Sequence, residues 1–124
     1  MNALQRIHRC LVPGGVLFDL QPLANTPVVN HSGVLGRLDE REFRAVADRV
    51  NSLLQETISA GLFAQEREIV ITVRHRFNEA AQLLTEVRTW TGTTIPPPLL
   101  KRIKRFVPPF EAQEGARLRR LRAL

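Results

Sequence analysis

The chain has 124 residues, 44% of them hydrophobic, which suffices for one small domain with its own core but not for two. A single cysteine excludes an internal disulfide framework or a cysteine-based metal site, and no apolar run reaches the roughly 18–20 residues that a membrane span needs. The whole net charge of +6 lies in residues 101–124, which carry eight Lys/Arg and two Asp/Glu, so the body of the chain is neutral.

The first expected elements are a helix and a strand joined by a tight turn. Apolar residues recur at helical spacing from residue 4 to residue 11, and a Pro-Gly-Gly turn follows. Residues 16–20 are almost continuously apolar, which predicts a strand buried on both faces of a parallel sheet that helices cover. Residues 22–37 are rich in Pro, Asn and Gly and predict a long loop, with a short extended segment at 34–38.

A long helix and a second strand are expected next. Asp39 and Glu42 have the spacing of a capping box, an apolar stripe runs over residues 43–58, and Gly61 stands where a helix commonly ends. In residues 66–77 one face carries Ile69, Ile71, Val73, His75 and Phe77, and the other carries Val70, Thr72, Arg74 and Arg76. This alternation predicts a half-buried strand near the edge of a sheet.

The remaining residues predict two helices and a basic tail. Asn78 is expected to cap a helix that runs to Trp90, and a shorter helix is expected over residues 98–106. The expected domain covers residues 1–107. Residues 108–124 are expected to form a tail that is either disordered or, if ordered, a basic helix with only three leucines to bury.

Two stretches of this sequence carry a resemblance to a known fold family. Residues Ala3–Pro22 read ALQRIHRCLVPGGVLFDLQP, a helix that ends in Leu-x-Pro-Gly-Gly before a buried strand, and Gly61–Trp90 supply a later strand and helix. Their order resembles the C-terminal half of a class I S-adenosylmethionine-dependent methyltransferase over about residues 1–95. The resemblance implies a Rossmann-like α/β fold with about two or three strands and four or five helices, lacking the cofactor-binding N-terminal half.

The residues that hold the cofactor in such enzymes have no counterpart in this sequence. A glycine-rich loop lets the backbone approach the cofactor, and an acidic residue takes the ribose hydroxyls. No GxGxG occurs in the 124 residues, and the double glycine Gly14-Gly15 precedes a strand instead of following one. The resemblance therefore implies S-adenosyl-L-methionine as the cofactor, and we expect this chain alone not to bind it.

Three residues are candidates for substrate binding. Asp19 and Gln21 stand at the end of the first expected strand, where open α/β sheets place their ligands, and would orient a methyl acceptor. The alternative is that both side chains cap the strand end and the next loop by hydrogen bonds. His31 lies in the long loop and is a candidate general base or acceptor contact, or else a solvated loop histidine.

The basic tail has candidates for nucleic-acid binding. These residues would contact RNA phosphates or an acidic protein surface, although no aromatic residue interleaves with them and no RNA-binding motif accompanies them. The alternative is a solvated tail. The four candidates are Arg117, Arg119, Arg120 and Arg122.

The remaining titratable residues predict no metal site. His8, His31 and His75 lack the spacing of metal ligands, and no cysteine or carboxylate pair completes a site with them. His75 shares its strand face with apolar residues, so a satisfied, partly buried histidine is expected there.

The sequence thus predicts a truncated methyltransferase-like protein that is inactive alone. One alternative is a non-catalytic interaction or dimerisation protein derived from that fold. A second is a nucleic-acid-binding protein that uses its basic tail, which is less favoured because the rest of the chain has no net charge. The expected partner is a second copy or the missing half, and the methyl acceptor stays open. We expect a cytoplasmic protein without membrane contact, because charged residues interrupt the N-terminal segment where a signal peptide is apolar.

Overall fold

The computed structural model describes residues 2–124, which form four helices and five strands. They divide into two compact units, which are described separately below. Unit 1 consists of residues 2–21, 46–71 and 116–124, and unit 2 of residues 22–45 and 72–115. In chain order the elements are α1 (Ala3–Cys10), β1 (Val16–Pro22), β2 (Pro27–Asn30), β3 (Gly33–Arg37), α2 (Arg41–Ser59), β4 (Phe63–Phe77), α3 (Ala80–Val87), α4 (Pro97–Arg105) and β5 (Phe110–Ala123).

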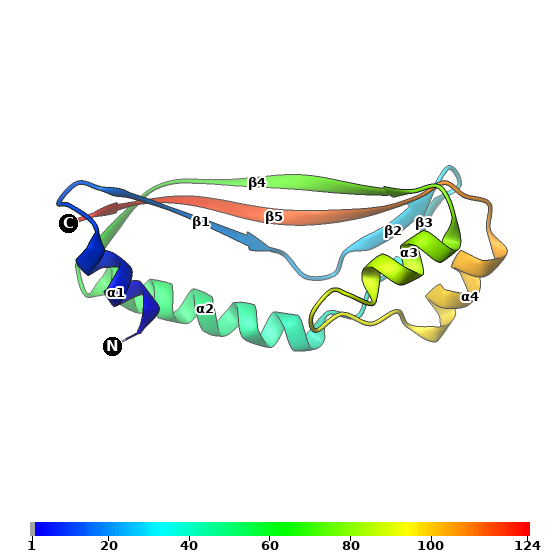
Figure 1. The fold of residues 1–124 in the computed structure, drawn as a ribbon, viewed down its shortest axis with the longest axis horizontal. Helices are drawn as coiled ribbons and strands as arrows, with labels where there is room; N and C mark the ends of the chain where they lie inside the picture. The colour runs from blue at the N-terminus through cyan, green and yellow to red at the C-terminus, as the bar shows by residue number, and fades with distance from the viewer. Residues whose placement is uncertain (1) are drawn as a thin grey trace. The chain divides into compact units, whose positions relative to one another are not determined.

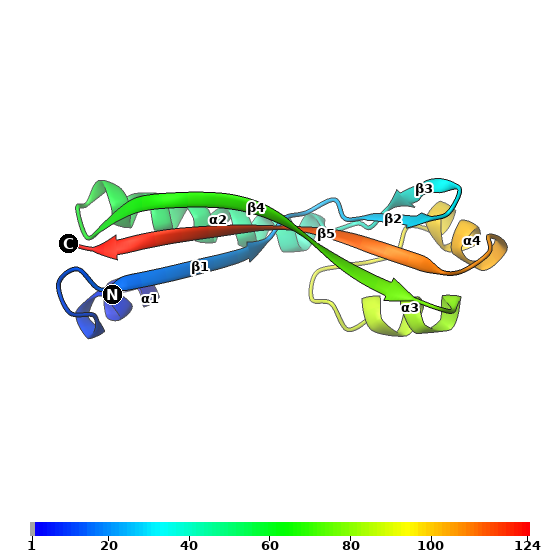
Figure 2. The same cartoon turned by 90° about the horizontal axis from the view of Figure 1, so that it is seen from above.

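Unit 1 contains a sheet of three strand segments in the order β1–β5–β4. Strand β5 is hydrogen-bonded to β1 on one side and to β4 on the other. In Figure 2 the arrows of β1 and β4 point the same way, and the arrow of β5 points against both. Neighbouring strands are therefore antiparallel, whereas β1 and β4 are parallel to each other and are separated along the chain by β2, β3 and helix α2.

The helices of unit 1 cover one face of its sheet. Figure 1 shows α1 and α2 on the same side of β1, β5 and β4. The core beneath them joins Leu4 of α1, Leu54 and Ile58 of α2, Leu17 of β1 and Leu121 of β5. Within the unit's described residues no helix lies on the opposite face.

The first helix and turn form as the sequence predicts. Asn2 and Gln5 close a reciprocal capping box, in which each side chain accepts a hydrogen bond at 2.9 Å from the other's backbone N–H. Gly14 adopts a φ of 80° in the turn that leads into β1, a conformation that favours glycine. The expected end of α2 is also confirmed, because Gly61 has a φ of 79°.

Unit 2 is built on a hairpin and two strand ends. Strands β2 and β3 pair antiparallel from Pro27 opposite Arg37 to Asn30 opposite Gly33, with an irregularity between Val28 and Val29. Val28 also pairs with Ala112 of β5, and β5 is hydrogen-bonded to β4. The core of the unit gathers apolar residues from this sheet and from α3 and α4, including Val28, Leu35, Phe77, Leu83, Val87, Leu99, Ile103 and Phe110.

The sheet differs from the expected parallel, doubly covered one. The α/β class is confirmed, but the neighbouring strands are antiparallel and number five instead of two or three. Strand β1 is also not buried on both faces, since Phe18 and Leu20 are 62% and 60% exposed. Continuous apolarity predicted two buried faces, whereas in the structure one of them is open.

The segment expected to be a long loop contains the β2–β3 hairpin. Its composition of Pro, Asn and Gly predicted a loop, yet two valines precede the turn and a valine and a leucine follow it. Val28 and Leu35 are the buried members of these pairs. The extended segment predicted at residues 34–38 is confirmed by β3.

Two predicted helix caps differ in the structure. Asp39 does not close a capping box with Glu42; it accepts a hydrogen bond from the backbone N–H of Arg41 at 3.2 Å. Asn78 does not cap the next helix, because its own backbone N–H donates to Gln82 Oε1 and α3 begins at Ala80. The short helix predicted after the prolines is confirmed as α4.

Residues 110–123 form strand β5 where a disordered or helical basic tail was expected. The strand is buried at alternate positions near its end, with Arg119, Leu121 and Ala123 each 3% exposed or less. Period-two burial is the signature of a strand with one covered face. The charge of the segment does not keep it in solvent, because neighbouring strands supply carboxylates.

Candidate functional site: the Asp19–Arg119 network

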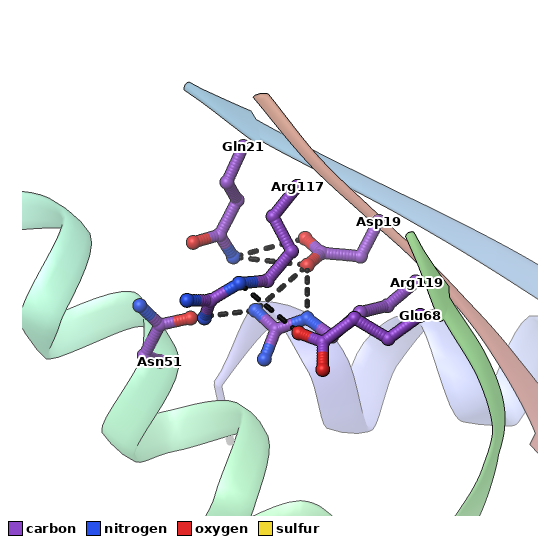
Figure 3. A network of polar contacts seen from close by, with 6 residues as sticks. All are labelled: Asp19, Gln21, Asn51, Glu68, Arg117 and Arg119. Carbon is purple, nitrogen blue, oxygen red and sulfur yellow. Dashed lines mark hydrogen bonds and ion pairs between the residues drawn. The ribbon is translucent and has the colours of Figure 1, made fainter. Parts of the chain in front are cut away.

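The predicted site residue Asp19 lies at the centre of a polar network in unit 1. Figure 3 shows its carboxylate between side chains from β1 and β5. Gln21 Nε2 donates to Oδ1 at 3.0 Å and to Oδ2 at 3.1 Å. Arg119 donates to Oδ2 from Nε at 3.1 Å, and its Nη2 lies 2.9 Å from the same oxygen. Both carboxylate oxygens therefore have donors within unit 1.

Arg119 connects this carboxylate to helix α2. Its side chain is only 3% exposed, and Nη2 also donates to Oδ1 of Asn51. A guanidinium can be buried this completely only when carboxylate and amide oxygens replace its water. Side chains alternate between the two faces of a strand, so Arg119 lies on the same covered face of β5 as Leu121 and Ala123.

The other three candidate arginines are also paired with carboxylates, all on β4. Arg117 Nε lies 3.0 Å from Glu68 Oε1 (Figure 3). Arg120 Nε and Arg122 Nε lie 3.3 and 3.0 Å from the two oxygens of Glu66. The hydrogen bond from Arg122 is the main reason that the pKa of Glu66 is lowered. These three arginines thus pair with carboxylates of the neighbouring strand. This pairing does not favour a role for them in binding the phosphates of a nucleic acid.

The structure brings together two of the three predicted substrate-binding residues. Gln21 Nε2 donates hydrogen bonds to the carboxylate of Asp19. His31 belongs to unit 2, where it is exposed in the turn between β2 and β3. The third candidate therefore stands in a different unit from the other two.

Three members of the network were missed by the sequence reasoning. Asn51 lies on α2, and Glu66 and Glu68 lie on β4, so each is more than 30 residues from Asp19 along the chain. The available signal was the glutamates near the start of β4 and the arginines near the end of β5, which predict cross-strand charge pairs once the two strands are known to be neighbours.

The chemical capacity of this network is structural and electrostatic. Its hydrogen bonds tie β1, β5 and α2 together. Among residues 2–124 no group of three or more His, Cys, Asp or Glu side chains is arranged to hold a metal ion. None of the helices in that range is both long and apolar enough to cross a membrane.

The opposite face of the same sheet carries an exposed apolar surface, here called the open face. It consists of the exposed Phe18 and Leu20 of β1 and Ile69 of β4, with the half-buried Leu118 of β5. A small hollow of about 170 Å³ is lined by three of these residues together with Arg67 and Arg120. Apolar residues gathered on one surface commonly mark a contact with another protein segment.

Comparison of the chain with protein-family models, with curated proteins and with solved structures finds no match. The fold and the surfaces described above are therefore the basis for inferring a function.

Proposed function

We propose that the chain is the C-terminal portion of a methyltransferase-like fold, which takes part in S-adenosyl-L-methionine-dependent methyl transfer only when a cofactor-binding portion pairs with it. The observation that carries this proposal is the position of β1. The strand follows a helix and a Pro-Gly-Gly turn and runs parallel to β4. Its edge away from β5 pairs with no other strand of residues 2–124. In a doubly wound sheet a strand in this position has a neighbour on both edges.

The open face supports the same proposal. Phe18 and Leu20 expose most of their surface, although their neighbours on β1 pack against the core. Helices cover both faces of a doubly wound sheet, and α1 and α2 cover one face here. We infer that elements of the cofactor-binding portion pack on the open face and pair with the free edge of β1.

The antiparallel β5 is compatible with this reading. Large α/β sheets are commonly mixed and combine parallel with antiparallel strands. In unit 1 the strands β1 and β4 are parallel, and β5 lies between them. The parallel pair is therefore the part that supports a Rossmann-like origin.

A second candidate function is that of a non-catalytic interaction protein. The same free edge favours it, because an unpaired strand edge beside apolar side chains is a template for pairing with a second copy. Gln21 and Arg119 also occupy most of the acceptor sites of the Asp19 carboxylate, which leaves fewer of them for a methyl acceptor.

Calorimetric titration with S-adenosyl-L-methionine tests the first candidate. We expect no saturable heat from the chain alone, because it has no glycine-rich loop. We expect saturable binding to appear when the chain is co-expressed with a strand–GxGxG–helix segment encoded beside it. Binding by the chain alone would contradict its dependence on a second portion. A co-purified pair that still fails to bind would favour the non-catalytic candidate.

A further inference from the structure

Unit 2 contains a cavity of about 320 Å³ that the network in unit 1 does not involve. Its size falls at the lower end of the range for small-molecule sites. Its walls carry two carboxylates, an imidazole and two aromatic rings. These belong to Glu40, Glu114, His75, Phe43 and Trp90.

Glu40 is a buried carboxylate without a cation. The residue is 5% exposed, and its side chain accepts one hydrogen bond, a long one of 3.4 Å from the backbone N–H of Thr26. Among the ion pairs formed by residues 2–124 none includes Glu40. A buried carboxylate is costly unless a positive charge or several donors compensate it. The side chain lines the cavity, which leaves room for such a charge.

The imidazole of His75 is a second polar group in the cavity wall that lacks a hydrogen bond. Its Nε2 atom is buried and has no hydrogen-bond partner among residues 2–124. The nearest carboxylate oxygen, Oε2 of Glu114, lies 3.9 Å away, which is beyond hydrogen-bonding distance. In the tautomer protonated on Nδ1, Nε2 is an acceptor that requires an N–H or O–H donor.

The aromatic wall matches a positively charged group. The ring of Trp90 lies 4.9 Å from that of His75, centroid to centroid, and Phe43 lines the same cavity. The faces of aromatic rings attract ammonium groups, and tryptophan does so most strongly. A metal ion is a poorer match, because no three His, Cys, Asp or Glu side chains of the described residues converge to hold one.

We propose that this cavity binds an alkylammonium group, with Glu40 and Glu114 as its counter-ions, Nε2 of His75 as a hydrogen-bond acceptor and the ring of Trp90 against the ammonium group. The group belongs either to a free small amine or to a lysine side chain of a peptide. The inference concerns unit 2 alone and does not depend on the proposed function in methyl transfer.

The fluorescence of Trp90 offers a direct measurement, because it is the single tryptophan of a chain that has no tyrosine. The probes are n-butylammonium chloride, its neutral counterpart 1-butanol, and N-acetyl-lysine methylamide, all at constant ionic strength. We expect a saturable change in emission with at least one of the two amines and none with butanol. Saturation with butylammonium assigns the site to free amines, and saturation with the lysine derivative alone assigns it to peptides.

Carboxamide variants test the assigned counter-ions. Glu40→Gln and Glu114→Gln are each expected to weaken amine binding by about tenfold or more, since each removes a charge-assisted contact. Glu111→Gln is the matched control, because Glu111 lies on β5 near Glu114 but does not line the cavity, and it should bind within about twofold of the parent chain. Far-UV circular dichroism and the thermal midpoint verify that each variant folds.

Several results would overturn the proposal. The proposal fails if neither amine produces a saturable change in emission. It also fails if butanol produces the same change as butylammonium. Equal weakening by all three glutamine variants would also overturn it, because it would show a general effect of charge. If Glu40→Gln fails to fold, Glu114→Gln and the butanol comparison still decide the question.

Discussion

Arg119 and Asp19 form a forked contact in which two guanidinium nitrogens, Nε and Nη2, approach one carboxylate oxygen at 3.1 and 2.9 Å. The arginine is almost fully buried and the aspartate is 21% exposed. The two residues are 100 positions apart in the sequence. This contact therefore joins the beginning of the chain to its end within unit 1.

Replacement of Arg119 by methionine is expected to destabilise unit 1. The variant leaves the Asp19 carboxylate and the Asn51 amide without their buried donor, which costs about 2–4 kcal/mol in the free energy of unfolding. Methionine keeps the length and apolar volume of the side chain, so lost packing contributes little. Urea denaturation followed by circular dichroism measures the effect.

The matched control for that experiment is Arg120→Met. Arg120 neighbours Arg119 on the same strand, but its side chain is 43% exposed and pairs with Glu66 in contact with solvent. Exposed pairs contribute at most about 1 kcal/mol. Equal destabilisation by the two variants would show that burial of the Asp19–Arg119 pair has no special role.

The pH dependence of stability is expected to include a contribution from Glu114 that favours acid solution. Burial, opposed by His75 and assisted by Glu40, raises the pKa of Glu114 above its ordinary value of 4.5. The folded protein then retains a proton that the unfolded chain releases. This contribution is full below about pH 4.5 and is lost as the pH rises through the raised pKa.

Glu114→Gln removes this titration. We expect its thermal midpoint, relative to the parent chain, to rise between about pH 4 and about pH 7. Thermal unfolding at both pH values measures the difference, and Glu111→Gln should not show the same rise. A midpoint difference that falls over this interval would mean that the folded protein stabilises the Glu114 carboxylate.

Glu66 is expected to show the opposite dependence. The hydrogen bond from Arg122 lowers the pKa of Glu66 below 4.5, so its stabilising contribution is present above that pH and is lost as the pH falls through the lowered value. Glu66→Gln should lower the thermal midpoint near neutral pH and leave it unchanged in strongly acid solution. Glu56→Gln, an exposed position on α2, serves as the control, and an equal effect of the two variants would contradict the assignment.

Gly92 is expected to be intolerant of substitution by alanine. Its φ is 68°, and an added Cβ would lie 2.7 Å from the backbone nitrogen of Phe43, so both strain and a clash with backbone would follow. We expect a loss of about 1–3 kcal/mol in the free energy of unfolding. Gly14→Ala is the control, because Gly14 has a φ of 80° with no atom near the added Cβ and reports strain alone. A smaller effect at Gly92 than at Gly14 would contradict the predicted clash.

Local patterns predicted most of the helical elements and the first strand. The Pro-Gly-Gly turn, the apolar stripe that ends at Gly61 and the prolines at the start of α4 all act on neighbouring residues, so their signals are present in short windows. Strand β5 was missed because its evidence is not local. Leu118, Leu121 and Leu124 recur every three residues and suggested a helix, whereas Leu121 packs in the core of unit 1 with side chains of α2 and β1.

The candidate site was predictable only where its residues lie close together in the sequence. Asp19 and Gln21 could be identified from their place at the end of a strand, and they do lie together. The partner Arg119 was identified only as a member of a charged tail, because its carboxylate is 100 residues distant. The sequence also favoured a satisfied histidine at position 75, whereas its Nε2 atom lacks a hydrogen-bond partner among residues 2–124.

The central claim is that the free edge of β1 and the open face form an association surface. Sedimentation velocity of the chain alone, over a range of concentrations, tests it most directly. We expect concentration-dependent association that the double variant Phe18→Ser, Leu20→Ser abolishes and that Val46→Ser, an exposed position on α2, leaves intact. A parent chain that stays monomeric throughout, or a double variant that associates equally well, would contradict the claim.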